Sequence, residues 1–294
     1  MPLLSLNERA VQTIKVPGSA DFIVLEGDEA WVTNEGRVEK LKAGSPTPVA
    51  SVAIAEPCGA MAIDFGSLWV VDCRDRTLVR VDLKSHRIAA TIPTGVADPI
   101  GELSVAAGAG SVWLLTDAAG VLSRVDPETN RVVARIPVQA NSFAAVFGEG
   151  SVWIAGSAGG TPSGAGSVQR IDPRSNSVIA TIPVGPGPRF LAAGAGGVWT
   201  LNQGDGTVSR VDPRTNRLAA TIAAEVPGTG GDIATGAGRV WVRATRTALS
   251  VIDPATNHVI ARYGPPCGSG AVRANERVVW VTAHDIQTVW VLKP

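Results

Sequence analysis

The chain has 294 residues, of which 45% are hydrophobic and 18% are charged, and it contains 33 glycines and 20 prolines. Lysine plus arginine and aspartate plus glutamate number 26 each, so neither a nucleic acid nor an acidic membrane surface is expected as a partner. No apolar run reaches the roughly 18 residues that a membrane-spanning helix needs. The many turn-forming residues argue against a largely helical fold.

In chain order, the most regular feature is a tryptophan that returns at intervals of about 40 residues, the length of a propeller blade. Each ends a short phrase such as Gly110-Ser111-Val112-Trp113, and the seven positions are Trp31, Trp69, Trp113, Trp153, Trp199, Trp241 and Trp280. Repeats of this length built from short alternating segments are typical of propellers. The sequence therefore predicts an all-β fold, a single seven-bladed β-propeller of four-stranded antiparallel blades.

The expected elements are a strand at 9–17 and blades at approximately 20–55, 58–94, 102–138, 142–184, 188–223, 230–262 and 267–294. The third blade shows the pattern, with strands expected at 103–107, 111–116, 121–126 and 131–138. Asp126-Pro127-Glu128-Thr129-Asn130 should form its tight third turn, because Asp, Pro and Asn each favour turn geometry. The second strand is apolar on both faces, as expected for a strand buried between blades.

The two ends of the sequence complement each other. The last repeat stops after its third strand, whereas residues 9–16 fit the pattern of an outer strand. We therefore expect the N-terminal strand to complete the last blade and close the ring, which removes an unpaired edge. One closed domain of this kind is expected to be a monomer.

Several recurring charged residues are interpreted as scaffold. Arg80, Arg124, Arg170 and Arg210 each precede an aspartate by two positions. A period of two places each arginine and its aspartate on one strand face, so we expect charge pairs between or beside blades.

Positions that break the repeat are the better candidates for function. They cluster at the starts of the inner strands and in the turns after the second strands, which we expect at one mouth of the central channel. Convergent polar groups at such a mouth predict a binding site. The expected ligand-binding residues are Asp21, Phe22, Cys58, Cys73, Arg189 and Phe190, and the expected catalytic residues are Asp232, Glu102 and His284.

The cysteines allow three interpretations. With the turn at Phe65-Gly66, Cys58 should face Cys73 on the adjacent strand, within reach of a disulfide. The alternatives are a metal-binding or catalytic thiol role and a pair of buried thiols, and Cys267 would be left unpaired in each case. A disulfide implies an oxidising compartment. We therefore expect a periplasmic or secreted protein whose signal peptide has been removed, with a cytoplasmic location as the alternative.

The Gly-x-Val-Trp-Val and Asp-Pro-x-Thr-Asn phrases resemble those of YVTN-type propellers and of the streptogramin (virginiamycin B) lyase family. Members of the lyase family carry Pro-His at the starts of the last two inner strands, with a nearby glutamate and a magnesium ion. The matching stretches here, 227–232 and 265–269, contain no histidine, and His284 belongs to a different strand. The family's catalytic residues therefore do not transfer to this chain.

Two classes of function remain. The favoured one is a binding or interaction module whose small-molecule or protein partner sits at the channel mouth. The alternative is a lyase or hydrolase for a cyclic ester or a sugar-like substrate. In that alternative an acid such as Asp232, Glu102 or Asp21 would be the general base, His284 the general acid, and Arg189 would hold an anion. The candidate cofactor is a divalent metal ion in the central channel, without an identified ligand set.

Replacing Arg189 and Asp232 with alanine is expected to leave stability almost unchanged, as for exposed polar positions.

Overall fold

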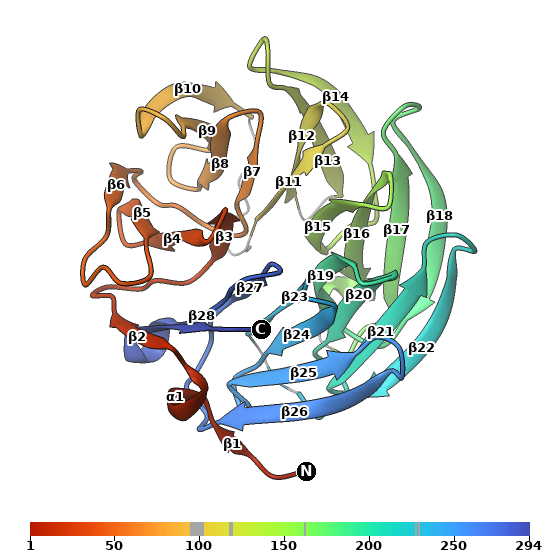
Figure 1. Ribbon diagram of the computed structural model, residues 1–294. Helices are drawn as coiled ribbons and strands as arrows, with labels where there is room; N and C mark the ends of the chain where they lie inside the picture. Colours follow the sequence, from red (N-terminus) through yellow and green to blue (C-terminus); the bar gives the residue numbers. More distant parts are fainter. Residues whose placement is uncertain (95–102, 118–119, 162, 227, 229) are drawn as a thin grey trace.

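The described part of the chain forms seven β-sheets set around a central channel, which confirms the predicted seven-bladed propeller (Figure 1). The computed structural model describes residues 1–94, 103–117, 120–161, 163–226, 228 and 230–294. In blades 1 to 5 the four strands pair antiparallel in sequence order, from an inner strand at the channel to an outer strand at the rim. The predicted start of the third blade, at Glu102, lies outside these described residues.

Blades 1 to 4 consist, from the channel outwards, of β3 (Ile23–Glu26), β4 (Glu29–Asn34), β5 (Arg37–Leu41) and β6 (Ala50–Ala53); β7 (Ala62–Asp64), β8 (Ser67–Asp72), β9 (Thr77–Asp82) and β10 (Arg87–Pro93); β11 (Ser104–Gly108), β12 (Ser111–Asp117), β13 (Val121–Asp126) and β14 (Arg131–Pro137); and β15 (Ser142–Gly148), β16 (Ser151–Ser157), β17 (Gly166–Asp172) and β18 (Ser177–Val184). Blades 5 to 7 consist of β19 (Pro188–Gly194), β20 (Gly197–Asn202), β21 (Thr207–Asp212) and β22 (Arg217–Ala223); β23 (Asp232–Gly236), β24 (Arg239–Arg243), β25 (Leu249–Asp253) and β26 (His258–Gly264); and β27 (Val272–Ala274), β28 (Val279–Ala283), β29 (Thr288–Leu292) and β2 (Gln12–Lys15). The helical segments that the described residues include are α1 (Leu6–Arg9), η1 (Ala158–Gly160) and η2 (His284–Ile286), and among these residues no helix is long and apolar enough to cross a membrane.

The N-terminal strand closes the ring, as predicted. β2 pairs antiparallel with β29 and supplies the outer strand of blade 7, with Ile14 opposite Val289. Ile14 is buried in a cluster that also contains Trp280. A feature that the sequence did not indicate is β1 (Leu4–Ser5), which runs parallel to β26 and adds a fifth strand to blade 6. The first residues of the chain therefore bind to two blades.

The repeated tryptophans are wedges between blades. Six of the seven are completely buried, and Trp241 is 5% exposed. Trp113 of blade 3, for example, packs in one cluster with Val152 and Ile154 of blade 4. β8 and β16 are buried along their length. In β12, residues 111–115 are buried, as the apolar pattern of the third blade predicted. The hydrophobic core therefore lies between consecutive blades.

The recurring arginines join each blade to the next, and the predicted pairing with their own aspartates is wrong. Arg80, Arg124, Arg170 and Arg210 each lie over the tryptophan of their own blade, at 4.9 to 5.1 Å between guanidinium carbon and ring centroid. Each also donates to a proline carbonyl and an asparagine Oδ1 in the third turn of the following blade. That asparagine has a φ near +55°, as expected for this turn. The aspartates instead accept hydrogen bonds from their own turns.

Candidate functional site

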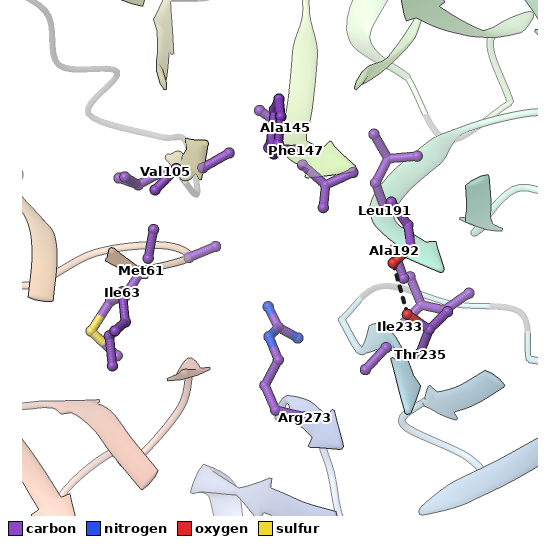
Figure 2. Close-up of a pocket in the computed structure, with 17 residues that line it drawn as sticks. Met61, Ile63, Val105, Ala145, Phe147, Leu191, Ala192, Ile233, Thr235 and Arg273 are labelled. Carbon is purple, nitrogen blue, oxygen red and sulfur yellow. Dashed lines mark hydrogen bonds between the residues drawn. The ribbon is translucent and has the colours of Figure 1, made fainter. Parts of the chain in front are cut away.

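One inner-strand position departs sharply from its equivalents in the other blades. The residue paired with the blade tryptophan is a small aliphatic in six blades, namely Val24, Ala62, Ala106, Val146, Ala192 and Ala234. In blade 7 the residue paired with Trp280 is Arg273. Because these positions lie on the innermost strands, the long side chain of Arg273 reaches into the channel (Figure 2).

The channel contains a cavity of about 250 Å³ around the end of this arginine. Its walls are mostly aliphatic, with Val105, Leu191 and Ile233 contributed by three different blades, and Phe147 adds an aromatic ring (Figure 2). The cavity lies beside the part of the inner strands that is nearer to their turns into the second strands. Among the described residues that line it, Arg273 is the only charged one.

A second, smaller cavity of about 30 Å³ continues towards the starts of the inner strands. Phe22, Phe143, Phe190 and Asp232 line it, and it shares Arg273 with the larger cavity. Its volume suffices for about one or two water molecules. The structure thus brings together three residues that the sequence nominated, namely Phe22, Phe190 and Asp232.

Asp232 and Arg273 form a buried ion pair between blades 6 and 7. Asp232 is 3% exposed, and its carboxylate accepts from the guanidinium of Arg273 and from the backbone N–H groups of Val272 (3.1 Å) and Ile233 (2.9 Å). Burial raises the pKa of the Asp232 carboxyl, whereas Arg273 and the two N–H groups act in the opposite direction. The pair fixes where the arginine enters the channel.

A second buried guanidinium lies next to this pair. Arg243 is completely buried, and its donors reach the carbonyls of Thr282 (3.0 Å) and Gly268 (2.8 Å) and the thiol sulfur of Cys267 (3.2 Å). Burial raises the pKa of the Cys267 thiol, and the charge of Arg243 opposes that rise. Because two of these contacts, those to Cys267 and Gly268, involve the segment between blades 6 and 7, we assign Arg243 a structural role in holding that segment.

Cys58 and Cys73 form a disulfide, with 6.0 Å between their Cα atoms. The register differs from the prediction, because the paired residues are Pro57 and Asp72, and each cysteine follows one member of that pair. Gly59, with a φ of +78°, then turns the chain so that Ala60 bonds to blade 3. The bonded cysteines pack against the cluster between blades 2 and 3. Neither cysteine lines either of the two channel cavities.

The remaining nominated residues are not gathered around the cavities. His284 Nδ1 lies 2.8 Å from Asp285 Oδ1, and the guanidinium carbon of Arg189 lies 4.4 Å from the ring centroid of Phe143. The carbonyl of Asp21 accepts from the hydroxyl of Thr282. Among the described residues, none of His284, Arg189 and Asp21 lines the two cavities. Glu102 lies outside the described residues.

The described residues contain no group of three or more His, Cys, Asp or Glu side chains that could hold a metal ion. The predicted divalent ion therefore has no ligand set in this part of the chain. The residue that sequence reasoning missed is Arg273. The sequence did contain a signal for Arg273. A charged residue stands there at the position that pairs with the blade tryptophan, where the other blades have a small aliphatic residue.

Comparison with known proteins agrees with the fold. No protein-family model and no curated protein matches the chain. Similar solved structures include virginiamycin B lyase from Staphylococcus aureus, with 10% identity, a TM-score of 0.77 and coverage of 96% of this chain and 98% of that one. A streptogramin B lyase has 11% identity, a TM-score of 0.73 and coverage of 97% and 96%. BamB from Moraxella catarrhalis has 14% identity, a TM-score of 0.68 and coverage of 97% of each chain.

These likenesses, at identities of 10 to 14%, establish the architecture. The chain is a seven-bladed β-propeller, and its fold is similar to that of virginiamycin B lyase. Its channel holds a cavity lined mostly by aliphatic side chains, with an arginine at one side.

Proposed function

We propose that this propeller is a binding protein that holds a small molecule in its central channel. The observation that carries the proposal is the cavity of about 250 Å³ with Arg273 extending into it. An apolar enclosure with one well-placed polar group is the common form of a small-molecule site, although this cavity is slightly below the usual range of about 300–1,000 Å³. A compact ligand would fit it.

Binding is better supported than catalysis because two of the nominated catalytic residues, Asp232 and His284, already have partners. A general base must reach the proton that it removes. Asp232 is buried, and its oxygens accept from Arg273 and two backbone N–H groups. His284 pairs with Asp285 and lines neither channel cavity. The lyase or hydrolase alternative therefore rests on the fold likeness, which does not carry an activity.

We further propose that the protein works in an oxidising compartment, the periplasm or the exterior of the cell. The disulfide between Cys58 and Cys73 supports this location, because such bonds persist mainly where thiols are not kept reduced.

A channel-filling variant tests the site. Ala192 lines the cavity on the inner strand of blade 5, whereas Ala219 is exposed on the outer strand of the same blade. A thermal-shift and calorimetric panel would contain benzoate, hexanoate, their amides, and neutral sugars. At least one compound should bind the wild type and Ala219→Phe but not Ala192→Phe. No binding by any compound, or equal binding by Ala192→Phe, would overturn the proposed site.

A further inference from the structure

Arg273 presents an unused edge to the larger cavity. Its Nη1 donates to Asp232 Oδ2 and to the carbonyl of Val272. Its Nε and Nη2 make no hydrogen bond to any described residue. Because Nε and Nη2 lie on the same side of the planar guanidinium, they form a fork of two parallel donors. Its side chain is 24% exposed, so the fork is accessible from the channel.

The partner of Arg273 lies on the side away from the larger cavity. Asp232 lines only the smaller cavity, whereas Arg273 lines both. The ion pair is therefore a dipole whose positive end faces the larger cavity. Because the guanidinium is partly removed from bulk water, its positive charge favours a negatively charged group at this position.

The side chains opposite Arg273 in the larger cavity favour a different chemistry in the rest of the ligand. Val105, Phe147, Leu191 and Ile233 surround the end of the arginine (Figure 2). The hydroxyl of Thr235 is already bonded to the carbonyl of Ala193 at 2.9 Å (Figure 2). Aliphatic and aromatic walls favour an apolar ligand body, because burial removes its surface from water.

We propose that the channel ligand is a small monocarboxylate with a compact apolar body, its carboxylate held in two-donor contact by Nε and Nη2 of Arg273. The inference rests on the proposed channel-binding function and names the ligand class. A planar carboxylate matches the guanidinium fork with two parallel hydrogen bonds. A phosphate would bring a larger charge and a larger hydration shell into an apolar cavity of this size.

Matched acid–amide pairs test the ligand class. Binding of benzoate against benzamide, and of hexanoate against hexanamide, is measured by calorimetry on the full chain. The carboxylate should bind at least tenfold more tightly than its amide. Arg273→Gln should remove this preference, and Arg239→Gln should retain it, because Arg239 forms an ion pair with Asp253 that lies outside the two channel cavities.

Two further variants separate recognition from folding. Asp232→Asn keeps an oxygen for one of the two backbone N–H groups but removes the opposing charge, so carboxylate binding should strengthen while amide binding stays the same. The double variant Asp232→Asn/Arg273→Gln removes both charges of the ion pair together, so it should fold, checked by circular dichroism, and lose the acid preference. If Arg273 had only a structural role, neither the stronger carboxylate binding of Asp232→Asn nor the loss of acid preference in the double variant would be observed.

The outcomes distinguish this inference from the function on which it rests. If amides bind as well as acids and Ala192→Phe blocks both, the channel site stands and the carboxylate class is wrong. If no compound binds the wild type, both are wrong. If the acid preference survives Arg273→Gln, another residue holds the anion and the inference is overturned.

Discussion

Arg124 joins two blades through Asn176: its Nη1 donates to the asparagine Oδ1 at 2.9 Å. The same nitrogen donates to the carbonyl of Pro173 at 2.8 Å, and the guanidinium carbon lies 5.1 Å from the ring centroid of Trp113. One side chain therefore links the wedge of blade 3 to the third turn of blade 4. Because the hydrogen bonds carry a charge and the guanidinium stacks on indole, this contact should contribute measurably to stability.

We predict that Arg124→Met lowers the free energy of unfolding by about 1–3 kcal/mol, because it keeps the apolar stem but removes the donors. Denaturant unfolding followed by tryptophan fluorescence measures the change. The matched control is Arg174→Met, since the side chain of Arg174 is 95% exposed. The control should stay within about 0.5 kcal/mol of the wild type. Equal effects of the two substitutions would contradict the linking role of Arg124.

The disulfide predicts a defined thiol count. In protein prepared without reductant and then unfolded, titration should find one thiol, that of Cys267, and reduction should raise the count to three. The double variant Cys58→Ser/Cys73→Ser should be less stable by about 3 kcal/mol, the chain-entropy value for a loop of about 15 residues. Three thiols before reduction would show that the bond does not form in solution.

The sequence was sufficient to predict the architecture because each blade repeats the same constraints. Trp113 and Trp153 lie at equivalent positions in consecutive blades, and a repeat spacing of about 40 residues admits few other folds. Ring closure was predictable as well, because residues 9–16 carry the outer-strand pattern that the last repeat lacks. The hydrogen-bond partners of the recurring arginines were not predictable, because Arg124 bonds to a turn about 50 residues further along the chain.

The site was harder to predict because its residues meet only in three dimensions. Phe190 and Asp232 were found because they break the repeat at the starts of inner strands. Arg273 was missed because it lies within an inner strand, whereas the candidates were taken from the starts of inner strands and from the turns after the second strands. The pairing of Asp232 with Arg273 joins neighbouring blades, and a single sequence gives no signal for such a contact.

Ring closure can be tested by truncation. Deleting residues 1–17 removes β2 and exposes the edge of β29, so we expect aggregation or a lower melting temperature. The control deletes residues 1–4, which shortens β1 but leaves β2 and its pairing with β29 intact. The two deletions should differ clearly in thermal unfolding. A full-length melting temperature after the longer deletion would mean that closure by β2 contributes nothing.

Glu29 predicts an acid-dependent loss of stability. Its hydrogen bond to Lys40, at 2.9 Å, lowers the pKa of the Glu29 carboxyl below its usual value. A lowered pKa means that the stabilisation is present above the unfolded pKa of about 4.3 and is lost as the pH falls through the folded pKa. Glu29→Gln should therefore reduce unfolding free energy at neutral pH and have less effect at acidic pH. As a control, Glu128→Gln at an exposed position should change the unfolding free energy at neutral pH by less than about 0.5 kcal/mol.

The ion pair in the channel makes the sharpest prediction about stability. The expectation that Asp232 could be replaced without cost assumed an exposed side chain, and that assumption is wrong because Asp232 is 3% exposed.

Arg273→Met leaves a buried carboxylate without its cation, which should cost about 3–5 kcal/mol. Asp232→Asn/Arg273→Met should recover part of this loss because it removes the unpaired charge. Arg239→Met, which breaks the surface pair with Asp253, should cost less than about 1 kcal/mol. Denaturant unfolding of the wild type, Asp232→Asn, Arg273→Met and the double variant gives the coupling energy, and a coupling near zero would mean that the two side chains do not stabilise each other.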